Sequence, residues 1–284
     1  MSRAIDVNHL GRDRVICAFE TPAGIVDPGP TSSVETLLEN LEDEQPRALL
    51  LTHIHLDHAG AAGVLCRRFP DLKVYVHERG ARHLADPSRL LASAERLYGD
   101  DMDRLWGEFA PVPEERIVAL AGGETIEGGF QVAYTPGHAS HHVSYLDEVT
   151  GEAYVGDVCG VRIPPHEYVI PPTPPPDIDV EAWMRSLDVV ASWRPRALNL
   201  THFGRYEDVP AHIERLREEL ALRSEKARSL DPELFNDWSV AETRASVDAE
   251  TAEALFQAAV PDQMGPGLRR YWDKRLEREQ EAVG

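Results

Sequence analysis

Residues 48–60, ALLLTHIHLDHAG, place three histidines and one aspartate directly behind an apolar run. A short apolar run of this kind is typical of a buried strand, and strand side chains alternate between the two faces of a sheet. His53 and His55, two positions apart, are therefore expected to project to the same side as the strand ends. Asp57 and His58 follow where the chain turns, so they can face a second point nearby. The segment predicts a sheet whose strand ends deliver these side chains into a cleft.

Imidazole and carboxylate groups together are typical ligands of a borderline cation such as Zn²⁺. Four ligands from so short a segment cannot easily surround one tetrahedral ion, which favours two adjacent metals with further ligands from distant parts of the chain. Three candidates also follow strand-like runs: His138 in AYTPGHASHHVSY, Asp157 in AYVGDVCG and His202 in LNLTHFG. The string LNLTH at 198–202 resembles LLLTH at 49–53, so each of two strands is expected to end in a Thr-His pair at a cleft.

Short strands alternate with helices over 1–207, and helices alone fill 208–284, which predicts a mixed α/β (α+β) catalytic domain with a helical C-terminal extension packed on it. The expected strands cover 14–21, 23–27, 48–53, 73–77, 116–120, 130–135, 142–147, 152–157 and 197–202. The expected helices cover 32–44, 59–69, 79–109, 179–192 and much of 208–281. Prolines exclude a helix or a central strand over 163–177.

Charge and cysteine usage restrict the partners of the chain. The formal charge of −20, from 49 acidic and 29 basic side chains, disfavours a nucleic-acid partner, because a polyanion must be gathered by lysines and arginines. Cys17, Cys66 and Cys159 have no CxxC spacing, which fits neither a disulfide framework nor a thiolate zinc finger. The N-terminus has no apolar segment of signal-peptide length, and no window approaches about 18 consecutive apolar residues. We therefore expect a cytoplasmic protein without a membrane partner.

The string His-x-His-x-Asp-His, followed in order by Thr-Pro-Gly-His, Gly-Asp and a strand-end histidine, resembles the metallo-β-lactamase superfamily over roughly residues 5–205. The resemblance implies an αββα sandwich, with extra helices inserted near 79–109 and at the C-terminus. It also implies a dinuclear site with His53, His55 and His138 on one metal, Asp57, His58 and His202 on the other, and Asp157 bridging the two. Zinc is the expected metal, with iron or manganese as alternatives. Asp27 in GIVDPG matches a recurrent aspartate of the superfamily and is expected to support the site.

This ligand set implies a hydrolase. A hydroxide held between two metals would attack the carbonyl group of a small ester, thioester or lactone without a separate general base. Asp57 is expected to orient the nucleophile or receive its proton as well as to bind metal. Tyr206 and Tyr168 are candidate hydrogen-bond donors to the developing oxyanion, although packing is the favoured role of each.

Other chemistries of the superfamily stay open at this point. Its members include glyoxalase-II-type thioesterases, lactonases, ribonucleases and other phosphodiesterases, and a mononuclear iron persulfide dioxygenase shares much of the motif. Asp157 argues against a β-lactamase, which usually lacks the bridging aspartate, and His55 argues against a flavodiiron protein. A non-catalytic metal-binding module is disfavoured because a degenerate site usually loses a ligand.

Two segments outside the motifs bear on the substrate. We expect residues 79–109 and the C-terminal helices to serve as scaffolding or as a homo-oligomer surface rather than as a lid over the site. As a lid they would form an apolar pocket for an acyl or aryl group of a small-molecule substrate.

Overall fold

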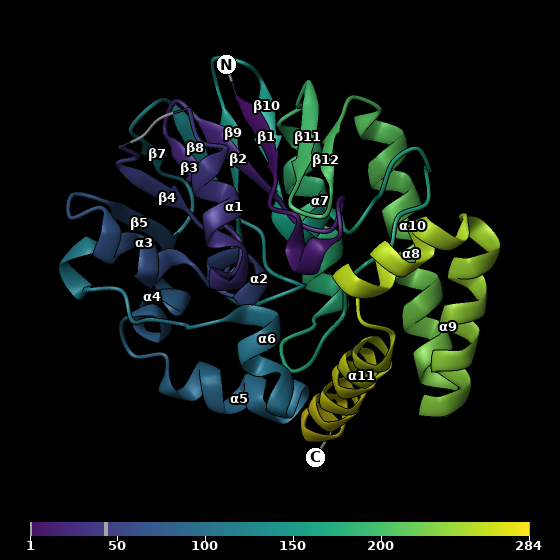
Figure 1. Cartoon of the computed structure of the whole chain (residues 1–284). Coiled ribbons are helices and arrows are strands. Elements are labelled where there is room, and N and C mark those ends of the chain that lie inside the picture. The colour runs from purple at the N-terminus through teal and green to yellow at the C-terminus, as the bar shows by residue number, and fades with distance from the viewer. Residues whose placement is uncertain (1, 43–44, 284) are drawn as a thin grey trace.

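The computed structural model describes residues 2–42 and 45–283, and the strands in these ranges form two sheets of six (Figure 1). The first sheet has the order β1 (Arg3–Asp6), β2 (Cys17–Thr21), β3 (Gly24–Val26), β4 (Ala48–Leu50), β5 (Lys73–His77) and β6 (Ile117–Leu120). The second has the order β12 (Gly204–Tyr206), β11 (Ala197–Leu200), β10 (Glu152–Tyr154), β9 (Val143–Asp147), β8 (Phe130–Tyr134) and β7 (Thr125–Ile126). Strands β3 to β6 are parallel, and the second sheet is antiparallel except for the β10–β11 pair.

Alternation along the strands separates two apolar cores. Leu50, Tyr75 and Tyr145 lie in the core between the two sheets. Leu49 and Val74, which directly precede Leu50 and Tyr75, point the opposite way into a larger core that the helices cover. The result is a four-layer arrangement of helices, sheet, sheet and helices, so the expected αββα sandwich is confirmed.

Helices flank both sheets (Figure 1). Those on the side of the first sheet are α1 (Val34–Glu39), α2 (Leu56–Ala59), α3 (Ala62–Arg68), α4 (Glu78–Ala85), α5 (Ser88–Tyr98) and α6 (Met102–Trp106). The later helices are α7 (Val180–Ser192), α8 (Val209–Ser229), α9 (Pro232–Ser246), α10 (Ala249–Ala258) and α11 (Pro261–Val283). None of these helices, within the described ranges, is both long and apolar enough to span a bilayer.

All nine expected strands are present, and 163–177 contains neither a helix nor a named strand. The sequence patterns did not predict β1, β7 and β12, which are short edge strands with few buried apolar side chains. The helical region 79–109 is divided into α4, α5 and α6, with breaks at Asp86-Pro87 and at Gly99, which has positive φ. The helices expected over 208–281 are four in number, and Asp231 and Asp248 cap the starts of α9 and α10.

The C-terminal helices are tied to the sandwich by buried polar contacts. His212 of α8 donates from Nε2 to the carbonyl oxygen of Cys159 at 2.8 Å. Arg223 of the same helix is fully buried and donates to Ser239 Oγ at 2.7 Å and to Tyr168 Oη at 2.6 Å. Helix α8 thereby joins the proline-rich loop to α9, and both sides share one apolar core.

His212 makes the stability of the protein depend on pH. Burial and then the nearby Arg162 lower the pKa of His212 to about 4, whereas a histidine in the unfolded chain titrates near 6.5. The unfolded state therefore binds the extra proton as the pH falls below about 6.5, so His212 favours folding fully above this pH and progressively less down to about 4. We expect the free energy of unfolding to fall by about 2 kcal/mol between pH 7.5 and pH 5 from this residue alone.

Urea titrations of the wild type and of His212→Gln at both pH values measure this contribution, because the amide of Gln can still donate to Cys159. The variant is expected to lose about 2 kcal/mol less than the wild type over this range. The same pH dependence in both proteins would contradict the assignment of a neutral His212.

Candidate metal centre

The structure brings the seven predicted ligands together at one edge of the sandwich. His53 and His55 follow β4, and Asp57 and His58 lie in the short helix α2 directly behind them. His138 follows β8, Asp157 lies in the 3₁₀ turn η5 (Gly156–Cys159) after β10, and His202 follows β11. Their ligand atoms form two groups, each with all atoms within 4.8 Å of one another: His53, His55, His138 and Asp157 in the first, and Asp57, His58 and His202 in the second.

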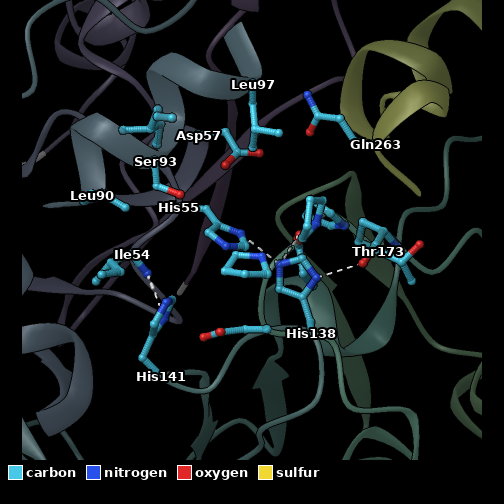
Figure 2. A pocket seen from close by; sticks show the side chains of 18 of the residues that line it. Ile54, His55, Asp57, Leu90, Ser93, Leu97, His138, His141, Thr173 and Gln263 are labelled. Carbon is cyan, nitrogen blue, oxygen red and sulfur yellow. Dashed lines mark hydrogen bonds and ion pairs between the residues drawn. The ribbon is translucent and has the colours of Figure 1, made fainter. Parts of the chain in front are cut away.

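The histidines of the first group bring their ring nitrogens close together, and Figure 2 shows two of them, His55 and His138. His55 Nδ1 lies 2.9 Å from His53 Nε2 and 2.9 Å from His138 Nε2. Burial, followed by the neighbouring histidines, lowers the pKa of His53 well below its ordinary value and that of His55 to about 3. These rings are therefore neutral at pH 7, which is the protonation state in which histidine binds metal.

Asp157 lies between the two groups. Its Oδ2 is 3.3 Å from His138 Nε2 in the first group, whereas its Oδ1 is 3.2 Å from His58 Nε2 and 3.7 Å from His202 Nε2 in the second. Asp57 completes the second group, with Oδ2 at 3.2 Å from His202 Nε2 and 3.8 Å from His58 Nε2. One carboxylate thus faces both groups, as the bridging role expected of Asp157 requires.

The outer nitrogen of three of the histidines is held by a hydroxyl or backbone carbonyl oxygen. His53 Nδ1 contacts Thr52 Oγ1 at 3.1 Å, and His138 Nδ1 contacts the Pro172 carbonyl oxygen at 2.8 Å. His202 Nδ1 lies 2.6 Å from the carbonyl oxygen of Val15. When Nδ1 donates its proton outwards, Nε2 carries the free lone pair and faces the centre. The backbone and neighbouring hydroxyl groups therefore select the ligating tautomer.

Asp27, at the end of β3, organises both Thr-His pairs. Its Oδ2 accepts from Thr52 Oγ1, Thr201 Oγ1 and His58 Nδ1, each at 2.7 Å, and its Oδ1 accepts from the backbone N–H of Thr52 at 2.8 Å. The two threonines precede His53 and His202, so the similarity between residues 49–53 and 198–202 has a structural cause: both threonines bind one buried carboxylate. The supporting role expected of Asp27 agrees with these contacts.

Buried polar atoms without partners indicate that the centre fits a cation. Among the described residues, His58 Nε2, His202 Nε2 and Asp157 Oδ1 are buried and have no hydrogen bond of acceptable geometry. Burial acts to lower the pKa of His58 and His202, but the carboxylates of Asp157 and Asp57 outweigh it and raise both above the ordinary value. A bound cation would take the place of the Nε2 protons of these histidines and neutralise the carboxylates at the same time.

A pocket of about 900 Å³ opens over the centre. His55, Asp57, His138 and Asp157 are part of its wall. Helix α5 supplies Leu90, Ser93, Ala94, Leu97 and Tyr98, α6 supplies Trp106, and the proline-rich loop and the start of α11 supply Pro172, Thr173, Gln263 and Met264. In Figure 2, Leu90 and Ser93 of α5 lie on one side of His55 and Gln263 of α11 lies on the other. The preference for 79–109 as scaffolding is therefore wrong for its inner face, because the local helical pattern does not show which surface a helix covers.

Neither tyrosine that the sequence suggested as an oxyanion donor lies on the pocket wall. Tyr206 Oη donates to the carbonyl oxygen of Arg162 at 2.7 Å. Tyr168 Oη accepts from buried Arg223. Both hydroxyl groups belong to the contacts between the sandwich and the C-terminal helices, so a structural role agrees with their position. Tyr98 of the 79–109 insertion, which the sequence did not suggest as an oxyanion donor, lies on the wall.

The two further histidines of the segment ASHHVS have different positions. His142 is fully buried, and its Nδ1 lies 3.0 Å from Thr135 Oγ1, while its ring stacks on His53 at 5.1 Å between centroids. His141 lines the pocket, 5.8 Å from the ring of His55. Neither belongs to the two ligand groups. The three histidines share one loop, and the geometry agrees with the sequence motif in assigning only His138 to a ligand group.

Comparison with known proteins agrees with this geometry. The profile of the metallo-beta-lactamase superfamily matches residues 19–202. The chain is 29% identical over 188 residues to the metallo-beta-lactamase fold-containing protein ST1585 of Sulfurisphaera tokodaii, covering 63% of this chain and 68% of that protein. It is also 30% identical over 141 residues to the hydroxyacylglutathione hydrolase GloC of Haemophilus influenzae. This match covers 49% of the present chain and 62% of that enzyme, which is less than two thirds of its length.

Solved structures show the same fold. The crystal structure of ST1585 from Sulfolobus tokodaii superposes with a TM-score of 0.71 at 23% identity, over 94% of this chain and 98% of that one. The structure of TTHA1623, described as di-iron-bound, gives a TM-score of 0.53 at 23% identity, over 76% of this chain and 92% of that one. With the profile match over most of the sandwich and the site described above, the chain belongs to the metallo-beta-lactamase superfamily, whose members are mostly metal-dependent hydrolases.

Proposed function

We propose that the protein is a hydrolase that uses two metal ions, in the first instance zinc, to cleave a small ester, thioester or lactone. The observation that carries this proposal is the position of Asp157, whose two oxygens face different groups of histidines beneath a pocket. One zinc ion takes three or four protein ligands, so seven ligands that include one shared carboxylate support two ions.

The residues fit the proposed ions in number and kind. The first ion would be held by His53, His55, His138 and Asp157, and the second by Asp57, His58, His202 and Asp157. When bound, such ions lower the pKa of water and withdraw charge from a carbonyl oxygen. Imidazole and carboxylate groups also suit iron and manganese, and the di-iron-bound form of TTHA1623 supports iron as the alternative.

The chain itself would position the reactants and handle the proton. Asp57 lies on the pocket wall, and although burial acts to raise its pKa, His58 and His202 lower it below the ordinary value, so the group is a carboxylate at pH 7. A carboxylate there is suited to orient a nucleophile and to accept a proton during the reaction. The apolar side chains of α5 would exclude water from the acyl group of the substrate.

Three observations support a small carbonyl compound as substrate. The pocket is lined by Leu90, Ala94 and Leu97, which suits an apolar acyl or aryl group. Relatives of the chain are named hydroxyacylglutathione hydrolases, which makes a thioester the first choice. The net charge of −20 disfavours binding of a nucleic acid, so a small molecule is the expected binding partner.

Metal analysis and a substrate panel test the proposal. Purified protein is expected to contain close to two transition-metal equivalents per chain, and to hydrolyse an acyl thioester, p-nitrophenyl acetate or a lactone. A chelator should abolish this activity and zinc should restore it. One tightly bound iron with oxygen consumption on persulfides would instead indicate a dioxygenase. Cleavage of bis(p-nitrophenyl) phosphate or precursor tRNA with all carbonyl substrates inert would indicate a phosphodiesterase, and metal binding without any turnover a non-catalytic module.

A further inference from the structure

Three arginines stand on the pocket wall without carboxylate partners. Arg79 and Arg82 come from α4 and Arg89 from the start of α5, and all three are exposed. Among the described residues, no carboxylate oxygen lies within the 4.0 Å ion-pair distance of any of these guanidinium groups. Unpaired arginines on a pocket wall are notable in a chain with twenty more acidic than basic side chains, where carboxylates are abundant.

The contacts around Arg82 leave its terminal nitrogens free. Its Nε donates to His83 Nε2 at 3.2 Å, so His83 accepts through a neutral ring, while neither Nη atom has a hydrogen bond among the described residues. Arg79 and Arg82 are three residues apart on α4 and therefore share one face of the helix. Two guanidinium groups with free Nη atoms can bind one carboxylate or phosphate, because the planar fork matches either group.

The basic wall lies beside the metal centre rather than over it. Gly80, which lies between Arg79 and Arg82 in α4, packs against Ile54 and His141, and in Figure 2 both of these lie on one side of His55 together with Leu90 of α5. Gln263 and Thr173 lie on the other side. An anionic group bound by the arginines would therefore be displaced from the reacting carbonyl, and would fix the direction in which the substrate enters.

The acidic groups on the same wall are not paired with these arginines. Glu78 and Asp177 also line the pocket, but Asp177 accepts from Ser140 Oγ at 2.5 Å, and neither is ion-paired to the three arginines in the described part of the chain. Asp57 and Asp157 face the metal ligands instead. Because the whole protein repels anions, a local basic wall is what an anionic substrate would need in order to bind.

We propose that Arg82 and Arg89, assisted by Arg79, form an anion subsite that selects acyl substrates carrying a carboxylate or phosphate group remote from the scissile bond. This inference rests on the proposed function as a carbonyl hydrolase, and it narrows the substrate class. The arginines act as specificity-determining residues, since they bind the remote group and not the reacting atoms.

Matched thioesters test the subsite. Acetyl thioesters of 3-mercaptopropionate, 2-mercaptoethyl phosphate and 2-mercaptoethanol place a carboxylate, a phosphate or no charge on the thiol half. Succinyl and butanoyl thioesters of 2-mercaptoethanol make the same comparison on the acyl half. With metal-loaded wild-type protein, kcat/KM for at least one anionic member is expected to exceed that of its neutral partner about tenfold or more. The preference should shrink near 1 M salt, where the Debye length is about 3 Å.

Variants identify the groups responsible. The double variant Arg82→Gln/Arg89→Gln is expected to lose the preference while keeping kcat/KM for neutral substrates. The double variant Arg82→Lys/Arg89→Lys should keep part of the preference for anionic substrates, because lysine retains the positive charge but lacks the planar guanidinium group that binds an anion through two nitrogens. Arg96→Gln is the matched control, because Arg96 is an exposed arginine of α5 that is not part of the pocket wall. Equal kcat/KM for anionic and neutral members in the wild type, or a preference retained by the Gln double variant, would overturn the subsite.

A binding measurement separates this inference from the proposed function. Ketone analogues, in which a methylene group replaces the thioester sulfur, cannot be hydrolysed, and calorimetry gives their dissociation constants. If the wild type hydrolyses none of the thioesters but binds an anionic ketone about tenfold more tightly than its neutral partner, with the difference lost in the Gln double variant, the subsite stands and the thioesterase proposal fails. If thioesters are hydrolysed and the ketones bind equally, the subsite fails and the proposed function stands.

Discussion

Replacing Asp157 with alanine is expected to lower turnover by at least about a thousandfold, equivalent to about 4 kcal/mol in the activation barrier. The side chain directs one oxygen to each group of ligands. Its loss therefore removes a ligand from both proposed ions, together with the negative charge that reduces the repulsion between them. Metal analysis of the same variant is expected to show fewer than two equivalents. Activity on an acyl thioester and metal content are measured on one preparation.

Two further variants make the test of Asp157 specific. Asp157→Asn keeps the shape but not the charge, and is expected to retain more metal than Asp157→Ala while remaining strongly impaired. His141→Ala removes a pocket side chain that belongs to neither ligand group, so its effect should be far smaller. Near-wild-type activity and two metal equivalents in Asp157→Ala would show that the carboxylate does not bridge.

Replacing Asp27 with alanine is expected to lower the free energy of unfolding by about 3 to 5 kcal/mol and to abolish hydrolysis as well. Asp27 is fully buried, and its loss leaves the hydroxyl groups of Thr52 and Thr201 and the Nδ1–H of His58 without their acceptor. Each unsatisfied buried donor costs about 1 to 3 kcal/mol. Urea denaturation measures the loss of stability, and titration with zinc measures the loss of affinity.

The conservative variant distinguishes positioning from general destabilisation. Asp27→Asn keeps a carbonyl oxygen that can accept some of these hydrogen bonds, and asparagine tolerates the positive φ of this position, 45°. We expect it to recover most of the stability but only part of the zinc affinity, because the charge that orients His58 is missing. Wild-type zinc affinity in Asp27→Ala would exclude the positioning role.

Local pattern was sufficient for those parts of the site that depend on neighbouring residues. The spacing of His53, His55, Asp57 and His58 behind an apolar strand predicted two clusters at a strand end, because strand alternation and the following turn are set within a few residues. The same reasoning identified His138, Asp157 and His202, since each follows a strand with a strong apolar pattern. The strand and helix patterns predicted only a mixed α/β body, and the αββα sandwich was expected from the resemblance to the superfamily.

Contacts between distant segments decided the rest. That Thr52 and Thr201 bind the same oxygen of Asp27, and that Asp157 directs one oxygen to each ligand group, depends on how the two sheets pack. The short edge strands, the inner face of 79–109 and the unpaired arginines of α4 and α5 were not predictable for the same reason. A sequence pattern shows which side chains of one segment are buried. It does not show which other segment covers them, because that depends on how the layers pack in the folded protein. Hence the chemistry of the ligands was determined by the sequence alone, while the bridging geometry and the walls of the pocket were decided only by the tertiary structure.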